Sequence, residues 1–251
     1  MYFFCELMTR FCFPQGIVTT TRITHATPAA LYSHIQHRNW EADSYFPEGD
    51  EYKRCDDIAK QLIYNNPGLK LDLIFGGGKR NFVTKSEGGK RNDENLIEAW
   101  KEKKKEQGNM WSVFLNKNEL EAWNQTGSAL GLFSMSHMDY VLERNVDEQP
   151  SLDLMVEQAI KRLKKNPNGF FLMVEGGRID HAHHKNWAKK ALEETLELEK
   201  AVKIASDLTK EEEETTLMVV TADHSHSLTI NGYPQRGNNI LGEIFYYFYL
   251  F

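Results

Sequence analysis

Residues 174–184 bring carboxylates and imidazoles close together at the end of an apolar run. Glu175 ends the run, two glycines follow it, and Asp180 and His184 come next, four residues apart. On a helix that spacing puts both side chains on one face, where a carboxylate and an imidazole are suitable ligands for zinc. The alternative is a histidine-rich surface turn. Three histidines and two carboxylates within ten residues favour metal binding over that alternative.

A second stretch of the same chemistry, residues 222–226, follows another apolar run. Asp223 and His224 are adjacent, so in an extended chain they point to opposite sides and reach one metal only if the chain bends. An isolated Asp-His pair is weak evidence for a metal site. Two such stretches, each after an apolar run, together predict a multi-metal hydrolytic centre in which cations hold the attacking and leaving oxygens.

An arginine and a glycine-rich turn raise the question of phosphate binding. Arg38 lies within residues 37–40, and its guanidinium fork matches phosphate oxygens, although an ordinary ion pair is the commoner role of an arginine. Residues 76–80, Gly-Gly-Gly-Lys-Arg, lack the Gly-Lys-Ser/Thr spacing of a phosphate-binding loop. We therefore predict a tight turn there, and an exposed loop over residues 79–93.

The elements that position these residues alternate between apolar runs and helical periodicity. Near-continuous apolar runs predict buried strands over residues 16–21, 71–78, 169–175 and 216–223. Helical spacing predicts helices over residues 56–64, 95–107, 151–163 and 186–208, with Ser151 as an N-cap. Strands alternating with helices predict an α/β fold, with a mainly parallel central sheet flanked by helices. Ligands in such folds bind at the carboxyl ends of the strands, so we expect one cleft there, lined by Thr27, Arg38, Glu175, Asp180, Asp223 and His224.

Composition excludes several classes of protein. The 251 residues carry a formal net charge of −6, which argues against a general nucleic-acid-binding protein. No apolar run approaches the length of a membrane span, and the eight apolar or aromatic residues 244–251 are too few to cross a bilayer. Three cysteines are too few for a disulfide scaffold.

Several of these stretches resemble one family, the animal alkaline phosphatases. The resemblance is carried by residues 16–29, 37–40, 170–184 and 219–226, and also by residues 131–133 and 232–237. The Glu-Gly-Gly-Arg-Ile-Asp-His and Thr-Ala-Asp-His-Ser-His motifs are highly specific in combination. The resemblance covers residues 16–242 as a partial alkaline phosphatase-like domain, and leaves residues 1–15 and 243–251 as unmatched ends.

This resemblance implies a function and a set of site residues. Family members hydrolyse phosphate monoesters at alkaline pH through a phosphoserine, using two zinc ions and one magnesium ion. By position, the implied metal ligands are Asp180 and His184 for the first zinc, Asp223 and His224 for the second, and Thr27 and Glu175 for magnesium. Arg38 matches the arginine that binds the substrate phosphate, and His181 and His226 match positions near the metals.

The sequence also departs from the family pattern. The nucleophilic serine belongs to an Asp-Ser-Ala motif upstream of the Thr-Thr-Thr-Arg strand, and no such motif occurs in these 251 residues. Asp43-Ser44 lies downstream, so we do not accept it as a substitute. An early aspartate that bridges zinc and magnesium and a late histidine of the first zinc site have no counterpart either. Each implied metal keeps two matched ligands, whereas a catalytic zinc has about three, and we expect an incomplete chain.

The resemblance also bears on calcium binding, on the state of one cysteine and on the cellular location. The acidic calcium ligand of many animal members is missing near residues 79–93, and Ser134 and Gln149 stand where two further carboxylates are expected, so calcium is not expected to bind. Cys55 matches a family cysteine whose partner lies upstream, and we expect a free thiol. The resemblance implies a phosphate monoester substrate, a homodimer and an extracellular, lipid-anchored location.

Two hypotheses follow for function. The first is a metal-dependent phosphomonoesterase, which the metal-binding motifs favour. The second is a non-catalytic phosphatase-like protein or an inactive fragment, which the missing serine motif favours.

Overall fold

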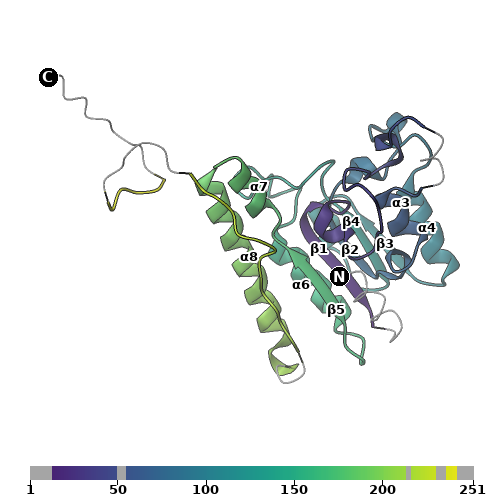
Figure 1. Ribbon diagram of the computed structural model, residues 1–251. Helices are drawn as coiled ribbons and strands as arrows, with labels where there is room; N and C mark the ends of the chain where they lie inside the picture. Colours follow the sequence, from purple (N-terminus) through teal and green to yellow (C-terminus); the bar gives the residue numbers. More distant parts are fainter. Residues whose placement is uncertain (1–12, 50–54, 213–215, 230–235, 242–251) are drawn as a thin grey trace.

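The computed structural model describes residues 13–49, 55–212, 216–229 and 236–241, and its centre is a parallel sheet of five strands (Figure 1). The strand order is β3-β4-β2-β1-β5, and each neighbouring pair is parallel. The strands are β1 (Gln15–Arg22), β2 (Leu73–Gly77), β3 (Trp111–Phe114), β4 (Ser128–Leu132) and β5 (Phe171–Glu175). The predicted α/β fold with a mainly parallel central sheet is therefore confirmed.

Four helices cover the two faces of this sheet. They are α3 (Ile58–Tyr64), α4 (Leu96–Glu106), α6 (Leu152–Leu163) and α8 (Ala188–Thr209). Successive residues of β1 point to opposite faces: Ile17 belongs to the core with α3 and α4, and Val18 belongs to the core with α6 and α8. Both are fully buried. The near-continuous apolar character of the strands is thus explained by burial on both sides.

Short helices connect these elements, and several helices of the fold begin with a side-chain cap. The remaining helical segments are α2 (Ala26–Ala29), α5 (Lys117–Glu121) and α7 (Arg178–His184), with single 3-10 turns at η1 (Asp43–Tyr45), η3 (Gly68–Lys70), η4 (Lys79–Asn81), η5 (Lys85–Glu87) and η6 (Lys210–Glu212). The predicted N-cap Ser151 accepts a hydrogen bond from the Leu154 amide, and Asn95 caps α4 in the same way. None of the helices in the described ranges has the length and apolar character that a membrane crossing requires.

The glycine-rich turn after β2 has the conformation that glycine permits. Gly78 has a φ of 96°, in the left-handed region. A Cβ atom on Gly77 would lie 2.2 Å from the carbonyl oxygen of Ser136, so the loop after β4 can cross the end of β2 only beside a glycine. The predicted tight turn is confirmed.

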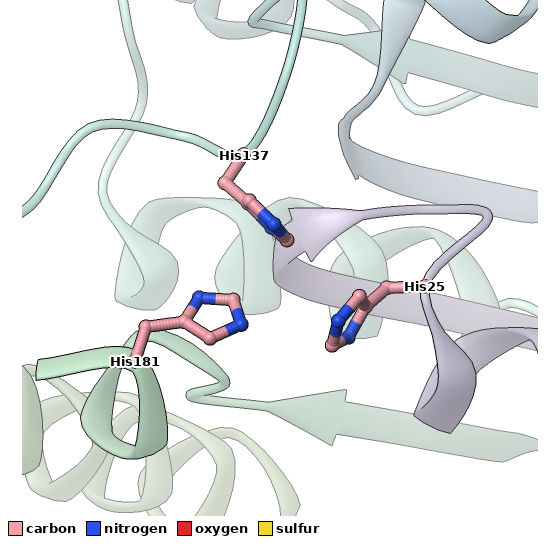
Figure 2. Close-up of side chains that lie close together, drawn as sticks. All are labelled: His25, His137 and His181. Carbon is pink, nitrogen blue, oxygen red and sulfur yellow. The ribbon is translucent and has the colours of Figure 1, made fainter. Parts of the chain in front are cut away.

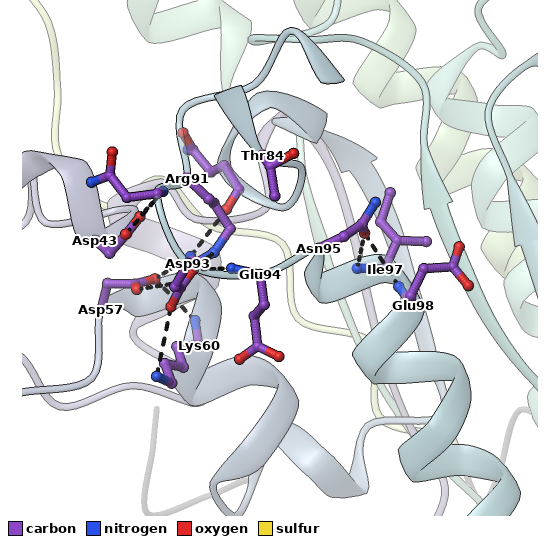
Figure 3. A network of polar contacts seen from close by, with 12 residues as sticks. Asp43, Asp57, Lys60, Thr84, Arg91, Asp93, Glu94, Asn95, Ile97 and Glu98 are labelled. Atoms are coloured by element: carbon purple, nitrogen blue, oxygen red, sulfur yellow. Dashed lines mark hydrogen bonds and ion pairs between the residues drawn. The ribbon is translucent and has the colours of Figure 1, made fainter. Parts of the chain in front are cut away.

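The exposed loop predicted over residues 79–93 is confirmed at residues 85–88, which are exposed, and is wrong at residues 81–83 and at Arg91, which are buried. Figure 3 shows Arg91 among its polar partners. The Arg91 guanidinium donates to both carboxylate oxygens of Asp57 at 2.9–3.0 Å and to Asp93 at 2.9–3.0 Å. Asp57 also caps α3 by accepting from the Lys60 amide. Glycine and lysine content suggested exposure, but two carboxylates supply the charge that allows burial of the guanidinium.

The strand predicted over residues 216–223 is also wrong. This segment is irregular, and the side chains of Leu217 and Val219 are 88% and 72% exposed. The described stretch 216–229, the returning segment, starts beyond η6 and ends beside the start of α8. There Asn186 exchanges two hydrogen bonds with the Thr229 backbone at 2.7 and 2.9 Å (Figure 1). Within the described residues, the sheet ends at β5. An apolar run forms a strand only where a neighbour pairs with its backbone and a layer covers its side chains.

The two unmatched ends fall outside this description except for residues 13–15, of which Gln15 begins β1. Residues 1–12 and 242–251 lie outside the described residues, and so does the aromatic run 244–251.

Candidate functional site

Glu175 stands at the carboxyl end of β5 and is held by hydroxyl groups. Thr19 and Thr21, both fully buried on β1, donate to Glu175 Oε2 at 2.6 and 3.2 Å. The parallel register pairs Thr19 with Glu175, so the contact follows directly from the sheet. Burial raises the pKa of Glu175, while hydrogen bonds from Thr19, Thr27 and Thr21 oppose the rise. A carboxylate among hydroxyl oxygens is a donor set that suits magnesium.

Asp180 on α7 is the meeting point of a second group (Asp180, His184 and His226). Asp180 Oδ2 lies 3.4 Å from His184 Nε2, and Asp180 Oδ1 lies 3.6 Å from His226 Nε2. One ligand atom of each of these three residues lies within 4.8 Å of the others. Asp180 Oδ1 is buried and has no hydrogen-bond partner. The helical spacing therefore places Asp180 and His184 on one face, as predicted, and a distant histidine joins them.

The histidines of the returning segment carry their ring protons on the side away from Asp180. Nδ1 of His224 contacts the Ser225 carbonyl at 2.7 Å, and Nδ1 of His226 contacts the Ser227 carbonyl at 2.8 Å. A carbonyl only accepts, so each Nδ1 donates. The Nε2 atoms then face Asp180 with their lone pairs available, which is the orientation that metal-binding imidazoles have.

Asp223 and His224 lie in this same neighbourhood but are loosely held. Their side chains are 74% and 57% exposed, and His224 Nε2 lies 3.9 Å from Asp180 Oδ1. The Ser225 carbonyl and then the Asp223 charge raise the pKa of His224. The Asp223 charge also raises the pKa of Glu175, so the two carboxylates interact. The predicted ligands therefore gather at one end of the sheet, although Asp223 and His224 do not follow a strand.

Arg38 lies at the edge of this region and contacts a histidine that the sequence did not single out. Its Nη2 is 3.2 Å from His25 Nε2, and the residue is exposed. Burial, followed by the charges of Arg22 and Arg38, lowers the pKa of His25 to about 4, while Asp180 opposes the change. The guanidinium and the Asp180 carboxylate therefore act in opposite directions on the pKa of the same imidazole.

Sequence reasoning missed a cluster of three imidazoles, His25, His137 and His181 (Figure 2). The ring centroids are 4.3–5.2 Å apart. Burial lowers the pKa of His181 to about 4 and that of His137 far below its usual value, and neighbouring arginines add to both changes. His181 was expected only near the metals. A signal was present for His25, which follows β1 and precedes Thr27 by two residues, but His137 lies in a loop without any periodic pattern.

The remaining predicted positions have ordinary local roles. Ser134 donates to the His137 carbonyl at 2.9 Å, and Gln149 exchanges hydrogen bonds with Asp139. In the part that the structure describes, Cys55 is an exposed free thiol.

Comparison with known proteins identifies the lineage of this site. The sequence profile of the alkaline phosphatase family matches residues 13–246. This chain belongs to the alkaline phosphatase family. The resemblance seen in the sequence is confirmed. The chain is 46% identical over 242 residues to a membrane-bound alkaline phosphatase of Bombyx mori, covering 91% of this chain and 43% of that protein. It thus spans less than half the length of this curated relative.

Solved alkaline phosphatases share the fold. The enzyme of Thermus thermophilus superimposes with a TM-score of 0.65 at 29% identity, covering 83% of this chain and 38% of that one. A variant of the alkaline phosphatase from the Antarctic bacterium TAB5, solved with Mg bound, has a TM-score of 0.61 at 23% identity over 83% of this chain and 51% of that one. The alkaline phosphatase family is metal-dependent, and the donor atoms found here are of the types such metals take.

Membership of a metal-dependent family suggests what would satisfy the unpartnered Asp180 Oδ1, namely a metal ion. A buried carboxylate oxygen without a hydrogen bond costs free energy, and a cation would satisfy it. Two imidazole nitrogens with free lone pairs face the same oxygen. The residues present therefore fit a metal ion at this position.

Proposed function

We propose that this chain forms the metal-binding and phosphate-binding part of an enzyme that hydrolyses phosphate monoesters. One observation carries the proposal, namely the convergence of His184, His224 and His226 on Asp180, whose Oδ1 is buried and lacks a hydrogen-bond partner. Membership of the alkaline phosphatase family supports the same chemistry. Because the chain spans less than half of a curated relative, the activity of the whole protein remains a proposal.

The proposed metal assignments follow the donor types. Asp180 and His184 would hold one zinc ion, Asp223 and His224 a second, and Thr27 and Glu175 a magnesium ion. Zinc takes nitrogen and oxygen ligands, whereas magnesium takes oxygen ligands, which matches the two sets of donors. His226 is within reach of the first set. When bound, the cations supply polarisation of the phosphoryl group and activation of an attacking oxygen.

The protein's own groups orient the substrate and the ligands. Arg38 is the group proposed to bind the phosphate, because a guanidinium makes two parallel hydrogen bonds to its oxygens. The Ser225 and Ser227 carbonyls hold His224 and His226 in the tautomer that frees Nε2. Thr19 and Thr21 hold the Glu175 carboxylate in one orientation. Pre-oriented donors of this kind reduce the reorganisation needed when a metal and a phosphate bind.

A second candidate is a non-catalytic protein that binds metal and phosphate. The observation that favours it is the lack of an Asp-Ser-Ala motif among the 251 residues, because the family reaction uses that serine as its nucleophile. Both candidates predict metal binding, and turnover separates them.

Metal binding is tested by calorimetric titration of the chain with zinc. We expect Asp180→Ala to abolish binding at the first site, and zinc to bind more weakly than in a protein with complete ligand sets. Asp207→Ala, an exposed carboxylate on α8, is the matched control and should bind as the unmodified chain does. Unchanged zinc affinity in Asp180→Ala would refute the proposed centre.

Turnover is tested with a chromogenic phosphate monoester at alkaline pH, with zinc and magnesium present. We expect the 251-residue chain to show little or no turnover, since orientation and charge stabilisation alone give a small rate. Rapid turnover that Arg38→Ala removes would show that the chain supplies its own nucleophile, and would refute the non-catalytic candidate. The homodimer and the extracellular, lipid-anchored location stay predictions, and light scattering of the purified protein would test the first.

A further inference from the structure

The turn between α7 and α8 contains a residue with an unusual backbone conformation. Asn186 has a φ of 55°, in the left-handed region. Its amide donates to the His183 carbonyl at 2.8 Å, and the next amide, of Trp187, donates to the Ala182 carbonyl at 2.9 Å. These two bonds form the Schellman motif that ends many helices, and its left-handed residue is usually glycine. The end of α7 therefore requires the backbone of Asn186 and makes no use of its side chain.

The Asn186 side chain binds the returning segment. Its Nδ2 donates to the Thr229 carbonyl at 2.7 Å, and its Oδ1 accepts from the Thr229 amide at 2.9 Å. We call this pair of contacts the Asn186 clasp. Within the described ranges, these are the two hydrogen bonds that join residues 216–229 to the rest of the chain. The side chain thus attaches the segment through the segment's backbone.

The clasp lies close in sequence to proposed zinc ligands on both of the segments that it joins. Asn186 lies two residues beyond His184, and Thr229 lies three residues beyond His226. His226 Nε2 lies 3.6 Å from the buried Asp180 Oδ1. A fixed point at Thr229 limits how far the imidazole of His226 can move from Asp180, because three residues of chain span at most about 10 Å.

We infer that Asn186 is a positioning residue, which fixes the returning segment so that the imidazole of His226 faces Asp180. Because the same zinc ligands are concerned, this role rests on the proposed function. The segment has no regular structure that would orient His226 by itself. An attachment beside the site raises the effective concentration of the imidazole at Asp180 and lowers the entropy that metal binding has to remove.

A contact between rings does not replace the clasp. The His226 ring is stacked on that of His183, with centroids 5.3 Å apart. This contact involves only the side chains, and the backbone of the segment can still rotate about their single bonds. Two hydrogen bonds to both polar groups of Thr229 fix the position and the direction of the chain. The clasp and the ring contact therefore act on different parts of the segment.

The test is a calorimetric titration of the whole chain with zinc. Asn186→Gly places there a residue that accepts the left-handed backbone, and it removes both hydrogen bonds of the clasp. We expect its affinity for zinc at the Asp180 site to fall about tenfold, the equivalent of two modest hydrogen bonds. Thr229→Ala keeps the backbone groups that Asn186 binds, so it is the matched control and should bind zinc as the unmodified chain does.

A double-mutant cycle with His226 separates positioning from support of the fold. In the His226→Ala chain there is no imidazole at this position to place, so we expect Asn186→Gly to lower zinc affinity there by no more than about twofold. Circular dichroism of the metal-free Asn186→Gly chain should match that of the unmodified chain, because glycine also suits the end of α7.

Three results would count against these roles. Unchanged zinc affinity in a folded Asn186→Gly chain, where Asp180→Ala abolishes binding, would overturn the role of Asn186 and leave the proposed function standing. Equal losses of affinity with and without His226 would also overturn that role, since they would indicate a general effect on the fold. Unchanged affinity in Asp180→Ala would refute the proposed function itself.

Discussion

Two regions carry the predicted metal ligands, and they hold them very differently. At the end of the sheet, Glu175 receives hydrogen bonds at 2.6 and 3.2 Å from two fully buried threonines of the neighbouring strand. On the returning segment, residues 216–229, the Asp223 side chain is 74% exposed, and its polar contacts include the amide and ring of the next residue, His224. A ligand is positioned only as firmly as the element that carries it.

The same contrast appears in two valines that both lie in apolar runs for which the sequence predicted strands. Val18 lies in an apolar run on β1 and is fully buried, whereas Val220 lies in a similar run and is 62% exposed. β1 has a hydrogen-bonded strand on either side and a helical layer on each face. Residues 216–223 have neither a paired strand nor a covering layer among the described residues. Partners, rather than apolar content, make a strand.

The largest effect on the free energy of unfolding is expected at the buried ion pair beside the sheet. Arg91→Met should destabilise the protein by about 3–5 kcal/mol, because it leaves the buried Asp57 carboxylate without its partner. Lys203→Met removes an exposed pair on α8 and should cost no more than about 0.5 kcal/mol. Urea unfolding of both variants checks this. Equal destabilisation would mean that burial does not decide the value of these ion pairs.

A second test concerns Glu194 on α8, the helix beside whose start the returning segment ends. Burial raises the pKa of Glu194 to about 7, the Glu197 charge adds to the rise, and the Val141 amide and the Arg144 and Arg178 charges oppose it. Above about pH 4.5 the unfolded chain loses this proton while the folded one keeps it, so the free energy of unfolding falls as pH rises to about 7. We expect this loss to be about 3 kcal/mol.

Glu194→Gln removes the titration and should flatten the dependence of stability on pH between about pH 5 and about pH 8. Glu199→Gln, on the exposed side of α8, is the matched control and should keep the profile of the unmodified protein. Thermal or urea unfolding over this range makes the comparison. A Glu194→Gln profile that matches the control would show that Glu194 does not hold its proton in the folded state.

The two valines give the most direct test of the comparison. Val18→Ala should cost about 2 kcal/mol, because it removes buried methyl groups and leaves a cavity between β1 and α6. Val220→Ala should change stability by less than about 0.5 kcal/mol, since that side chain is largely exposed. Urea unfolding measures both. A comparable loss in Val220→Ala would show that residues 216–223 are packed in solution.

The smallest effect uses the same substitution in each region. Thr19→Val removes the hydroxyl that donates to Glu175 and accepts from the Thr21 amide, and should cost about 1–2 kcal/mol. Thr221→Val removes an exposed hydroxyl and should have no measurable effect on stability. Magnesium titration of the two variants sharpens the comparison, because only Thr19→Val should alter binding near Glu175. Equal responses would mean that the hydroxyls of β1 do not orient that carboxylate.

Much of the fold follows from local patterns. Apolar runs predicted strands at β1, β2 and β5, helical periodicity predicted α3, α4, α6 and α8, and a capping residue marked the start of α6. β3 and β4 were not predicted, although residues 131–133 had been noted for their resemblance to the family. β3 has only one buried residue among its four, and β4 (SALGL) mixes small and polar residues with its two leucines, so neither forms a continuous apolar run.

The sequence by itself determined which side chains share a face, because helical and extended geometry repeat with fixed periods. It paired Asp180 with His184 in this way, and it placed Glu175 at a strand end. Only the tertiary structure decided that His25, His137 and His181 meet, that Arg91 is buried against Asp57, and that residues 216–223 remain irregular. Each of these outcomes depends on residues far apart along the chain. Packing and pairing between distant segments set them, and no local repeat encodes which segments become neighbours.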